Sequence, residues 1–151
     1  MPLRYVNLPT GILRLQGTDR ALKEVRLVEV AGPEEAPEAL SRCARELTEY
    51  FAGTRREFSV SAAPEGTVFQ MAVWEALKTI PYGTTLTYAQ VAKRVGKPGA
   101  ARAVGNAVGA NPCLILIPCH RVVAAGGIGG FSGGVENKRQ LLTLEGITDF
   151  G

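Results

Sequence analysis

The residues best suited to covalent chemistry lie in one segment, Pro118-Cys119-His120-Arg121-Val122. Cysteine is the strongest nucleophile near neutral pH, but only as the thiolate, and a free thiol with a pKa of about 8.5 is only slightly ionised there. His120, the single histidine of the chain, follows Cys119 directly and is a candidate base. Because adjacent residues of a strand point to opposite faces, their contact would require a bridging water or a kink at Pro118. The segment predicts an activated cysteine.

An apolar run over residues 113–117 comes directly before this segment and predicts a buried strand that carries the site to the edge of a core. Cys43 and Cys113 are expected to be small buried hydrophobic residues. A glycine-rich loop over residues 126–134 follows the site, and it fits no nucleotide-phosphate motif. Its glycines would let backbone groups and a flat ligand come close to the nucleophile.

A helix predicted over residues 135–144 ends at the carboxylate of Glu145. Leucines at positions 141, 142 and 144 indicate that one face of this helix is buried. Two interpretations of Glu145 remain open. Either its carboxylate orients the imidazole of His120, or it is an exposed side chain at the helix end beside Gly146.

The first 62 residues predict a small supporting domain of mixed strands and one helix. Strands are expected at 3–8 and 12–15, around the turn Pro9-Thr10-Gly11, and again at 23–30 and 56–61. A helix is expected over 40–51, ended by Gly53. Residues 63–66 read as a linker, and residues 67–151 as a second domain that carries the chemistry.

The second domain is predicted to be mainly helical. Its first helix begins at Thr67 and contains Trp74, whose spacing is typical of a core residue. Helices over 88–95 and 100–109, joined by a short turn with Gly99, predict a helix-turn-helix. The last of these is rich in alanine and glycine, with Arg102 as its one charged residue, so it is expected either to approach a DNA minor groove closely or to lie in the core.

Composition narrows the class of protein. A chain of 151 residues that is 46% hydrophobic can form one ordinary domain or two small ones. No apolar run reaches the roughly 18 residues of a membrane span, and the N-terminus lacks the apolar core of a signal peptide. Three cysteines cannot all pair within the chain, and a reactive thiol would not survive in an oxidising compartment, so the sequence predicts reduced thiols and a cytoplasmic location. One histidine and scattered cysteines predict no metal site.

Charge is distributed unevenly along the chain. Residues 1–66 carry nine basic and ten acidic side chains, whereas residues 67–135 carry six basic side chains against one acidic side chain, Glu75. An excess of positive charge in the C-terminal half favours a polyanionic partner there.

Together, the motifs of this half resemble those of the alkylguanine-DNA alkyltransferases, proteins that repair guanine alkylated on its 6-oxygen and are consumed in doing so. The resemblance spans about residues 67–147 and includes the spacing between motifs, whereas the first 62 residues resemble the family's variable first domain only loosely. It implies an α+β protein without a cofactor, acting as a monomer on double-stranded DNA that contains alkylated guanine. The motifs that carry it are Tyr88, Ala101-Arg102-Ala103-Val104-Gly105, Asn111-Pro112, Ile117-Pro118-Cys119-His120-Arg121-Val122, Ser132-Gly133-Gly134 and Leu141-Leu142-x-x-Glu145-Gly146.

The resemblance implies a catalytic role for five residues. Cys119 would accept the alkyl group, His120 would remove the thiol proton through a water, and Glu145 would hold the imidazole. Asn111 would brace the turn that carries the cysteine. Tyr88 would protonate the guanine as it leaves.

It also implies residues that hold the DNA. Arg102 would fill the gap left by the flipped base, since a base inside a duplex cannot meet a protein thiolate. Further DNA contacts are expected at Thr87, Arg94, Lys97, Ala101 and Gly105. The base pocket is expected to include Val122, Phe131, Ser132 and Trp74. Phe131 departs from the family, which usually has a tyrosine there, and so removes a hydroxyl from the pocket's rim.

Three other functions remain open at this point. Alkyltransferase-like proteins share the fold but lack the acceptor cysteine and only mark lesions, which the presence of Cys119 disfavours. A cysteine hydrolase with ordinary turnover would need a water path to an acyl intermediate. A sequence-specific transcription regulator is disfavoured by the sparse recognition helix.

Overall fold

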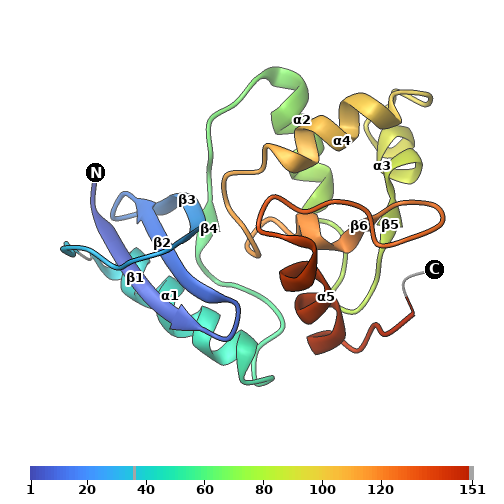
Figure 1. The fold of residues 1–151 in the computed structure, drawn as a ribbon. Coiled ribbons are helices and arrows are strands. Elements are labelled where there is room, and N and C mark those ends of the chain that lie inside the picture. Colours follow the sequence, from blue (N-terminus) through green and yellow to red (C-terminus); the bar gives the residue numbers. More distant parts are fainter. Residues whose placement is uncertain (36, 150–151) are drawn as a thin grey trace. The chain divides into compact units, whose positions relative to one another are not determined.

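A computed structural model of the chain describes residues 1–35 and 37–149. It has the α+β architecture expected from the sequence and divides into two compact units (Figure 1). The first contains residues 1–64 and 112–116, and the second contains residues 65–111 and those from 117 onwards. We expected the second domain to run without interruption from residue 67, and the placement of residues 112–116 in the first unit corrects that expectation.

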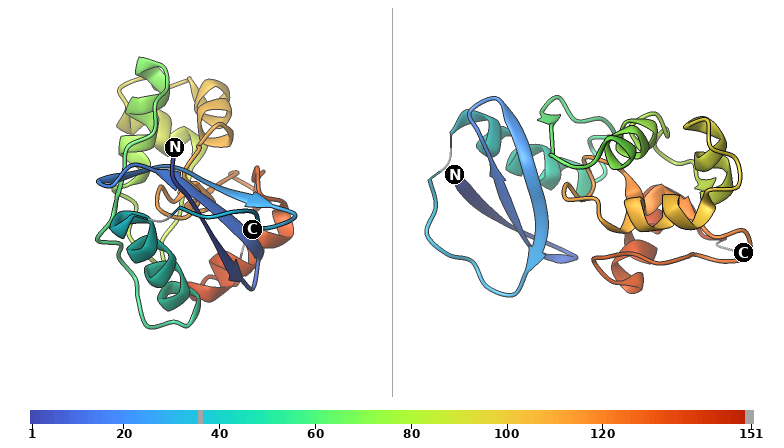
Figure 2. Two further views of the ribbon diagram at one scale, coloured as in Figure 1. Left: turned by 90° about the vertical axis from the view of Figure 1, so that its left-hand side faces the viewer. Right: turned by 90° about the horizontal axis from the view of Figure 1, so that it is seen from above.

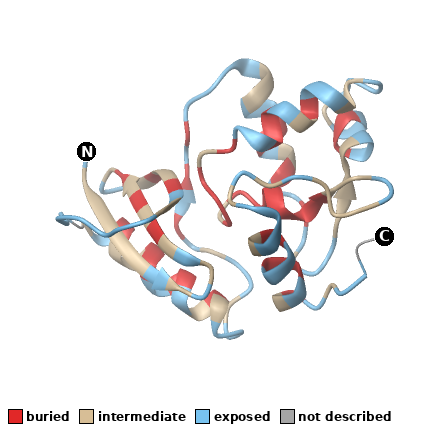
Figure 3. Cartoon of the chain, viewed as in Figure 1, coloured by how far each residue is buried: buried red, intermediate tan, exposed pale blue. Residues whose placement is uncertain are grey.

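The first unit contains a four-stranded sheet in the order β1-β2-β3-β4. Strands β1 (Leu3–Leu8), β2 (Gly11–Gly17) and β3 (Ala21–Val28) are antiparallel, and β4 (Ser61–Ala62) pairs parallel to β3. Alternate residues of the central strand β2, Leu13 and Leu15, are buried, as the period of a strand requires. Helix α1 (Glu38–Phe51) packs against β1, β2 and β3 and buries Leu40 and Leu47 (Figures 2 and 3).

The strand expected over residues 56–61 is reduced to the two residues of β4. The buried carboxylate of Glu46 on α1 explains the difference, because it accepts hydrogen bonds from the backbone N–H of Ser59 (2.9 Å) and from the Ser59 hydroxyl. Backbone donors that bond to a buried side chain are not available to a strand ladder.

The apolar run before the candidate site is not the strand that we predicted. Pro112 and Leu114 bond to the backbone of Val25 in β3 (O to N 2.8 Å, N to O 3.1 Å), but the pairing stops there. Ile115 has a φ of +72°, and a hydrogen bond from Leu116 N to Leu114 O (2.8 Å) closes a γ-turn around it. A β-branched residue at positive φ is rare, and such a conformation costs on the order of 1–3 kcal/mol.

The second unit is built around helices α2 (Val68–Leu77), α3 (Tyr88–Arg94), α4 (Ala101–Gly109) and α5 (Val135–Leu144). Helices α2, α3 and α4 pack against one another, and the short strands β5 (Leu86–Thr87) and β6 (Val122–Val123) pair in parallel. Thr67 and Thr87 start α2 and α3 with capping boxes, in which the threonine and a glutamine three residues later satisfy each other's backbone N–H. The described residues include no helix long and apolar enough to cross a membrane.

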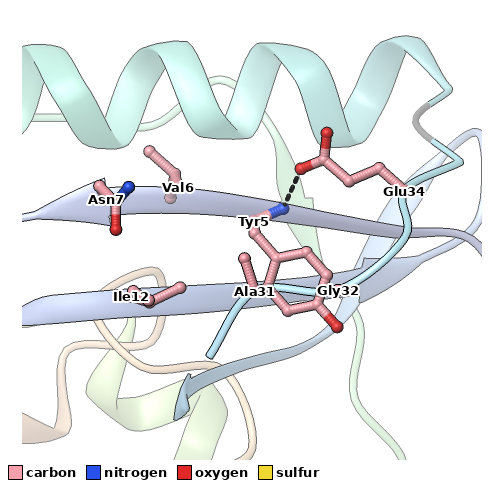
Figure 4. A pocket seen from close by; sticks show the side chains of 7 residues that line it. All are labelled: Tyr5, Val6, Asn7, Ile12, Ala31, Gly32 and Glu34. Atoms are coloured by element: carbon pink, nitrogen blue, oxygen red, sulfur yellow. Dashed lines mark hydrogen bonds between the residues drawn. The ribbon is translucent and has the colours of Figure 1, made fainter. Parts of the chain in front are cut away.

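A surface pocket of about 460 Å³ lies at the β1 edge of the first unit (Figure 4). Its lining includes Tyr5, Asn7, Ile12 and Glu34. The Glu34 carboxylate accepts a hydrogen bond from the Tyr5 backbone N–H at 2.7 Å, and so satisfies an outward-facing donor of the edge strand. Among the described residues, the pocket's lining includes no cysteine, serine or lysine, and the Glu34 carboxylate is engaged with the backbone.

Candidate active site

Cys119 is the first residue of a short 3-10 helix, η1 (Cys119–Arg121), in the second unit. Pro118 precedes it with φ −79° and ψ 64°, an inverse γ-turn closed by a 2.7 Å hydrogen bond from Cys119 N to Ile117 O. Asn111 Nδ2 donates to the same carbonyl at 2.8 Å, so the amide braces this turn. The kink considered at Pro118 is therefore present, and it replaces the straight strand of our prediction.

The thiol of Cys119 is almost fully buried, with an exposed fraction of 2%. Burial raises its pKa to about 11, although a hydrogen bond with Asn111 and the positive charge of Lys138 both act to lower it. The resting side chain is therefore a thiol, and its reaction requires a group that takes the proton. Cys43 and Cys113 are buried in the first unit and are not part of a disulfide among the described residues, as expected.

His120 supplies a candidate for that group. Its Nε2 lies 2.8 Å from Glu145 Oε2, and both side chains are buried. Burial lowers the pKa of the imidazole, an effect that the hydrogen bond and the negative charge of Glu145 offset only in part. The ring is thus neutral near pH 7, with its proton on Nε2 facing the carboxylate. Nδ1 is buried and has no hydrogen-bond partner among the described residues, which leaves its lone pair available.

Glu145 caps the C-terminus of α5 and is only 6% exposed, so the alternative of an exposed helix-end carboxylate is wrong. Arg121 donates to both of its oxygens, from Nε at 2.8 Å and from Nη2 at 2.9 Å. The backbone N–H of Gly83 donates to Oε1 at 3.0 Å. The carboxylate is therefore held from three sides.

Sequence reasoning missed two cations at this site, Arg121 and Lys138. Lys138 is fully buried on α5, and its ammonium donates to the carbonyls of Val122 (2.6 Å) and Gly130 (2.9 Å). Burial lowers its pKa to about 8, whereas the charge of Cys119 acts to raise it. Its position could have been found, because residues 138, 141, 142 and 145 share one helix face.

Tyr88 begins α3, and its ring lies beside two glycines. A Cβ placed on Gly105 of α4 would lie 3.8 Å from the ring, and one placed on Gly129 of the glycine loop would lie 2.9 Å from the Tyr88 hydroxyl oxygen. The approach of the Gly129 backbone to this hydroxyl therefore depends on the missing side chain.

We expect Gly129→Ala to displace the Tyr88 hydroxyl and to slow transfer by about tenfold or more. Gly129 has a φ of +77°, so alanine is strained there as well as overlapping the hydroxyl. Gly126→Ala is the matched control, because a Cβ at that position meets nothing within 4 Å. Transfer rates of the two variants on the same alkylated substrate are the measurement, and equal rates would contradict the packing argument.

The residues expected to contact DNA lie on α3, on α4 and in the turn between them. Arg102, Arg94 and Lys97 are exposed, whereas Ala101 and Gly105 are half-buried. Thr87 is the N-cap of α3, and Arg94 donates to the Thr79 hydroxyl at 3.1 Å. The residues next to Arg102 are small, so little side-chain bulk covers the backbone on this face of α4.

The residues expected in the base pocket do not all have the same surroundings. Val122 is buried with its carbonyl bonded to Lys138, Phe131 is half-buried, and Ser132 is exposed. The expectation that Trp74 lines the base pocket is not met. Trp74 is 3% exposed, and its indole N–H donates to Ala107 O of α4 at 2.9 Å, so it is a core residue between α2 and α4. Within the part of the chain that the structure describes, no group of three or more His, Cys, Asp or Glu is placed to hold a metal ion.

Comparison with known proteins agrees with this geometry. Residues 68–147 match the family described as "6-O-methylguanine DNA methyltransferase, DNA binding domain", and residues 4–64 match its "ribonuclease-like domain". The chain belongs to this family.

Its relatives include proteins named "Methylated-DNA--protein-cysteine methyltransferase". The one from Mycolicibacterium paratuberculosis is 44% identical over 94% of this chain and 90% of its own length, and the one from Methanosarcina acetivorans is 44% identical over 91% and 94%. The crystal structure of the Mycobacterium tuberculosis O6-methylguanine methyltransferase has a TM-score of 0.87 at 44% identity, covering 95% of this chain and 92% of that one. A structure of OGT from Mycobacterium tuberculosis in complex with DNA also has a TM-score of 0.87, at 45% identity over 95% and 91% of the two chains.

Proposed function

We propose that this protein repairs DNA by moving an alkyl group from the 6-oxygen of guanine to Sγ of its own Cys119, once per molecule. The observation that carries the proposal is the buried Cys119 thiol on a turn braced by Asn111, beside a neutral imidazole that Glu145 orients. Relatives at 44% identity over nearly the whole chain bear the name of this activity. The presence of an acceptor thiol in this setting favours transfer over lesion marking.

The reaction begins with removal of the thiol proton. His120 Nδ1 accepts the proton of Cys119 through a water, while Nε2 keeps its hydrogen bond to Glu145. The thiolate attacks the alkyl carbon, a sulfur–carbon bond forms, and the bond from that carbon to the guanine oxygen breaks. The electron pair goes to the guanine, which Tyr88 protonates as it leaves. A thioether is not hydrolysed, so the protein is consumed.

Double-stranded DNA is the proposed partner, bound by the basic face of α3, α4 and the turn between them. A base must leave the stack to reach a buried thiol, at a cost of a few kcal/mol. The exposure of Arg102 on α4 supports a role for its side chain in filling the gap. We further propose that the protein acts as a monomer and in the cytoplasm, where a reducing environment preserves a free reactive thiol.

The function is tested by intact-protein mass spectrometry after incubation with DNA that contains O6-methylguanine. One added methyl group on the Cys119 peptide, with repaired DNA never exceeding protein on a molar basis, is the expected result. Product in excess of protein would instead identify a turnover enzyme, and unmodified protein bound to DNA would identify a lesion marker.

Arg102→Ala should slow repair of duplex DNA by an amount worth roughly 1–3 kcal/mol, the scale of a lost stacking contact. Its reaction with free O6-benzylguanine, which needs no base flipping, should hardly change. The measurement is the ratio of the two rates in the variant and in the native protein. Equal slowing on both substrates would show that Arg102 supports the fold or the thiol rather than the flipped state.

A further inference from the structure

We propose that Arg121 is a positioning residue of the proton relay, which acts through Glu145 to keep His120 a neutral proton acceptor. The proposal rests on the proposed function only in assigning the thiol proton to His120. Its electrostatic part concerns the resting protein and can be measured without DNA or transfer.

The first observation is the way in which Arg121 holds Glu145. Its guanidinium forms two parallel hydrogen bonds to the carboxylate, from Nε to Oε1 (2.8 Å) and from Nη2 to Oε2 (2.9 Å). Such a bidentate pair sets the plane of the carboxylate as well as its position. Because Oε2 also bonds to His120 Nε2, the plane of the carboxylate determines where the imidazole can point.

The second observation is that Arg121 is itself held firmly. Its Nη1 donates to the Ile80 carbonyl at 2.8 Å, and the guanidinium lies 5.7 Å from the centre of the Tyr82 ring. With an exposed fraction of 8%, Arg121 is shielded from solvent, and its charge acts on Glu145 with little screening. An arginine stays protonated at every pH of interest.

The third observation is the number of donors around Glu145. His120, two of the three guanidinium nitrogens of Arg121 and the Gly83 backbone N–H direct at least four hydrogen bonds at it, about as many as a carboxylate has lone-pair positions. The carboxylate is therefore stabilised as an anion and is a poor acceptor for the histidine proton. Glu145 can orient the imidazole without taking its proton away.

The charges around His120 explain why the negative charge of Glu145 has to be balanced by Arg121. The charges that act on the imidazole are those of Glu145 and Lys138, at the end of α5 and on it, and that of Arg121, on the same short helix as His120. Helix α2, which also packs on η1, has one charged residue, Glu75, which is exposed and paired with Lys78. A buried carboxylate without a fixed counter-charge would draw a proton onto the neighbouring imidazole. An imidazolium cannot accept the thiol proton, so the relay would stop at its first step.

The experiment measures the ionisation of His120 by NMR, which is unambiguous because the chain has a single histidine. In the native protein we expect a neutral Nε2–H tautomer near pH 7. In Arg121→Met we expect the pKa of the imidazole to rise by about one unit or more, the usual effect of an uncompensated nearby carboxylate. The acidic limb of the pH–rate profile for reaction with O6-benzylguanine should shift to higher pH by the same amount. A folded Arg121→Met protein whose histidine titrates as in the native protein would overturn the proposal.

Two more variants keep the test decisive. Arg121→Lys retains the charge but not the paired hydrogen bonds, so His120 should stay neutral while transfer slows about tenfold. If Arg121→Met does not fold, a transfer rate of Arg121→Lys equal to that of the native protein would overturn the positioning role. Tyr82→Phe is the control for local packing, because it removes the hydroxyl that donates to Leu144 O (3.3 Å) but keeps the ring beside the Arg121 guanidinium, and it should leave the titration of His120 unchanged.

If Arg121→Met alters the titration of His120 but no protein form transfers an alkyl group, the proposed function fails while the electrostatic role of Arg121 stands.

Discussion

Cys119→Ser should eliminate alkyl transfer while the protein still folds and binds DNA. The substitution replaces one atom in a fully packed site, so it creates no cavity and leaves the turn braced by Asn111 in place. A serine hydroxyl is far less ionised than a thiol at any accessible pH. We expect a loss of transfer to the detection limit, measured by protein mass after incubation with methylated DNA.

Two controls accompany this variant. Cys43→Ser changes a buried thiol of the first unit and should leave transfer intact, although at some cost in stability. Burial and the negative charge of Glu46 raise the pKa of that thiol far above its usual value, so it is a poor nucleophile. DNA affinity of Cys119→Ser should match that of the native protein. Methylation of the protein that persists in Cys119→Ser would mean that another residue accepts the alkyl group.

Lys138→Met should slow the chemical step by about tenfold to a hundredfold. The ammonium provides positive charge toward Cys119 and so favours the thiolate that forms during reaction. Methionine retains the length of the apolar stem but supplies no charge and leaves the carbonyls of Val122 and Gly130 without this donor. Reaction with O6-benzylguanine as a function of pH is the measurement, and the rise in rate should move to higher pH in the variant.

Lys78→Met is the matched control for Lys138→Met, because Lys78 lies exposed at the end of α2 beside Glu75. It should react like the native protein with the free base. An equal pH profile for Lys138→Met and the native protein would show that Lys138 only supports the loop carbonyls. A lower rate at an unchanged profile would point to the same structural role.

The sequence predicted most helices and strands because their signals are local. The alternation in β2, the threonine–glutamine boxes that start α2 and α3, and the leucine face of α5 each lie within a few residues. The candidate nucleophile and base were also local, since Cys119 and His120 are neighbours. The resemblance to a family added Asn111 and Tyr88, and it favoured one of the two interpretations of Glu145.

What the sequence did not reveal depends on contacts between distant residues. The strand expected over 56–61 is reduced to β4 because Glu46, on another element, accepts hydrogen bonds from the backbone N–H groups of Ser59 and Val60. Trp74 follows a helical period that fits a core or a pocket equally well, and only its bond to Ala107 decides. The roles of Arg121 and Lys138 arise from three-dimensional partners that no spacing rule specifies, namely the Glu145 carboxylate and two loop carbonyls.

The assignment of residues 112–116 to the first unit has a consequence for the order in which the protein is made. During synthesis the sheet partners of β1 to β4 are all available once residue 62 has emerged, but the N–H and C=O of Val25 acquire their partners only when Pro112 and Leu114 follow. Until then β3 has an exposed stretch of backbone, the kind of edge to which other chains can add. A contact across almost ninety residues (about the length of a whole small domain) also slows the search for the native state. The first unit is thus begun early in synthesis but is completed only after residues 112–116 have emerged. A fragment that stops after about sixty residues should therefore be prone to associate with itself.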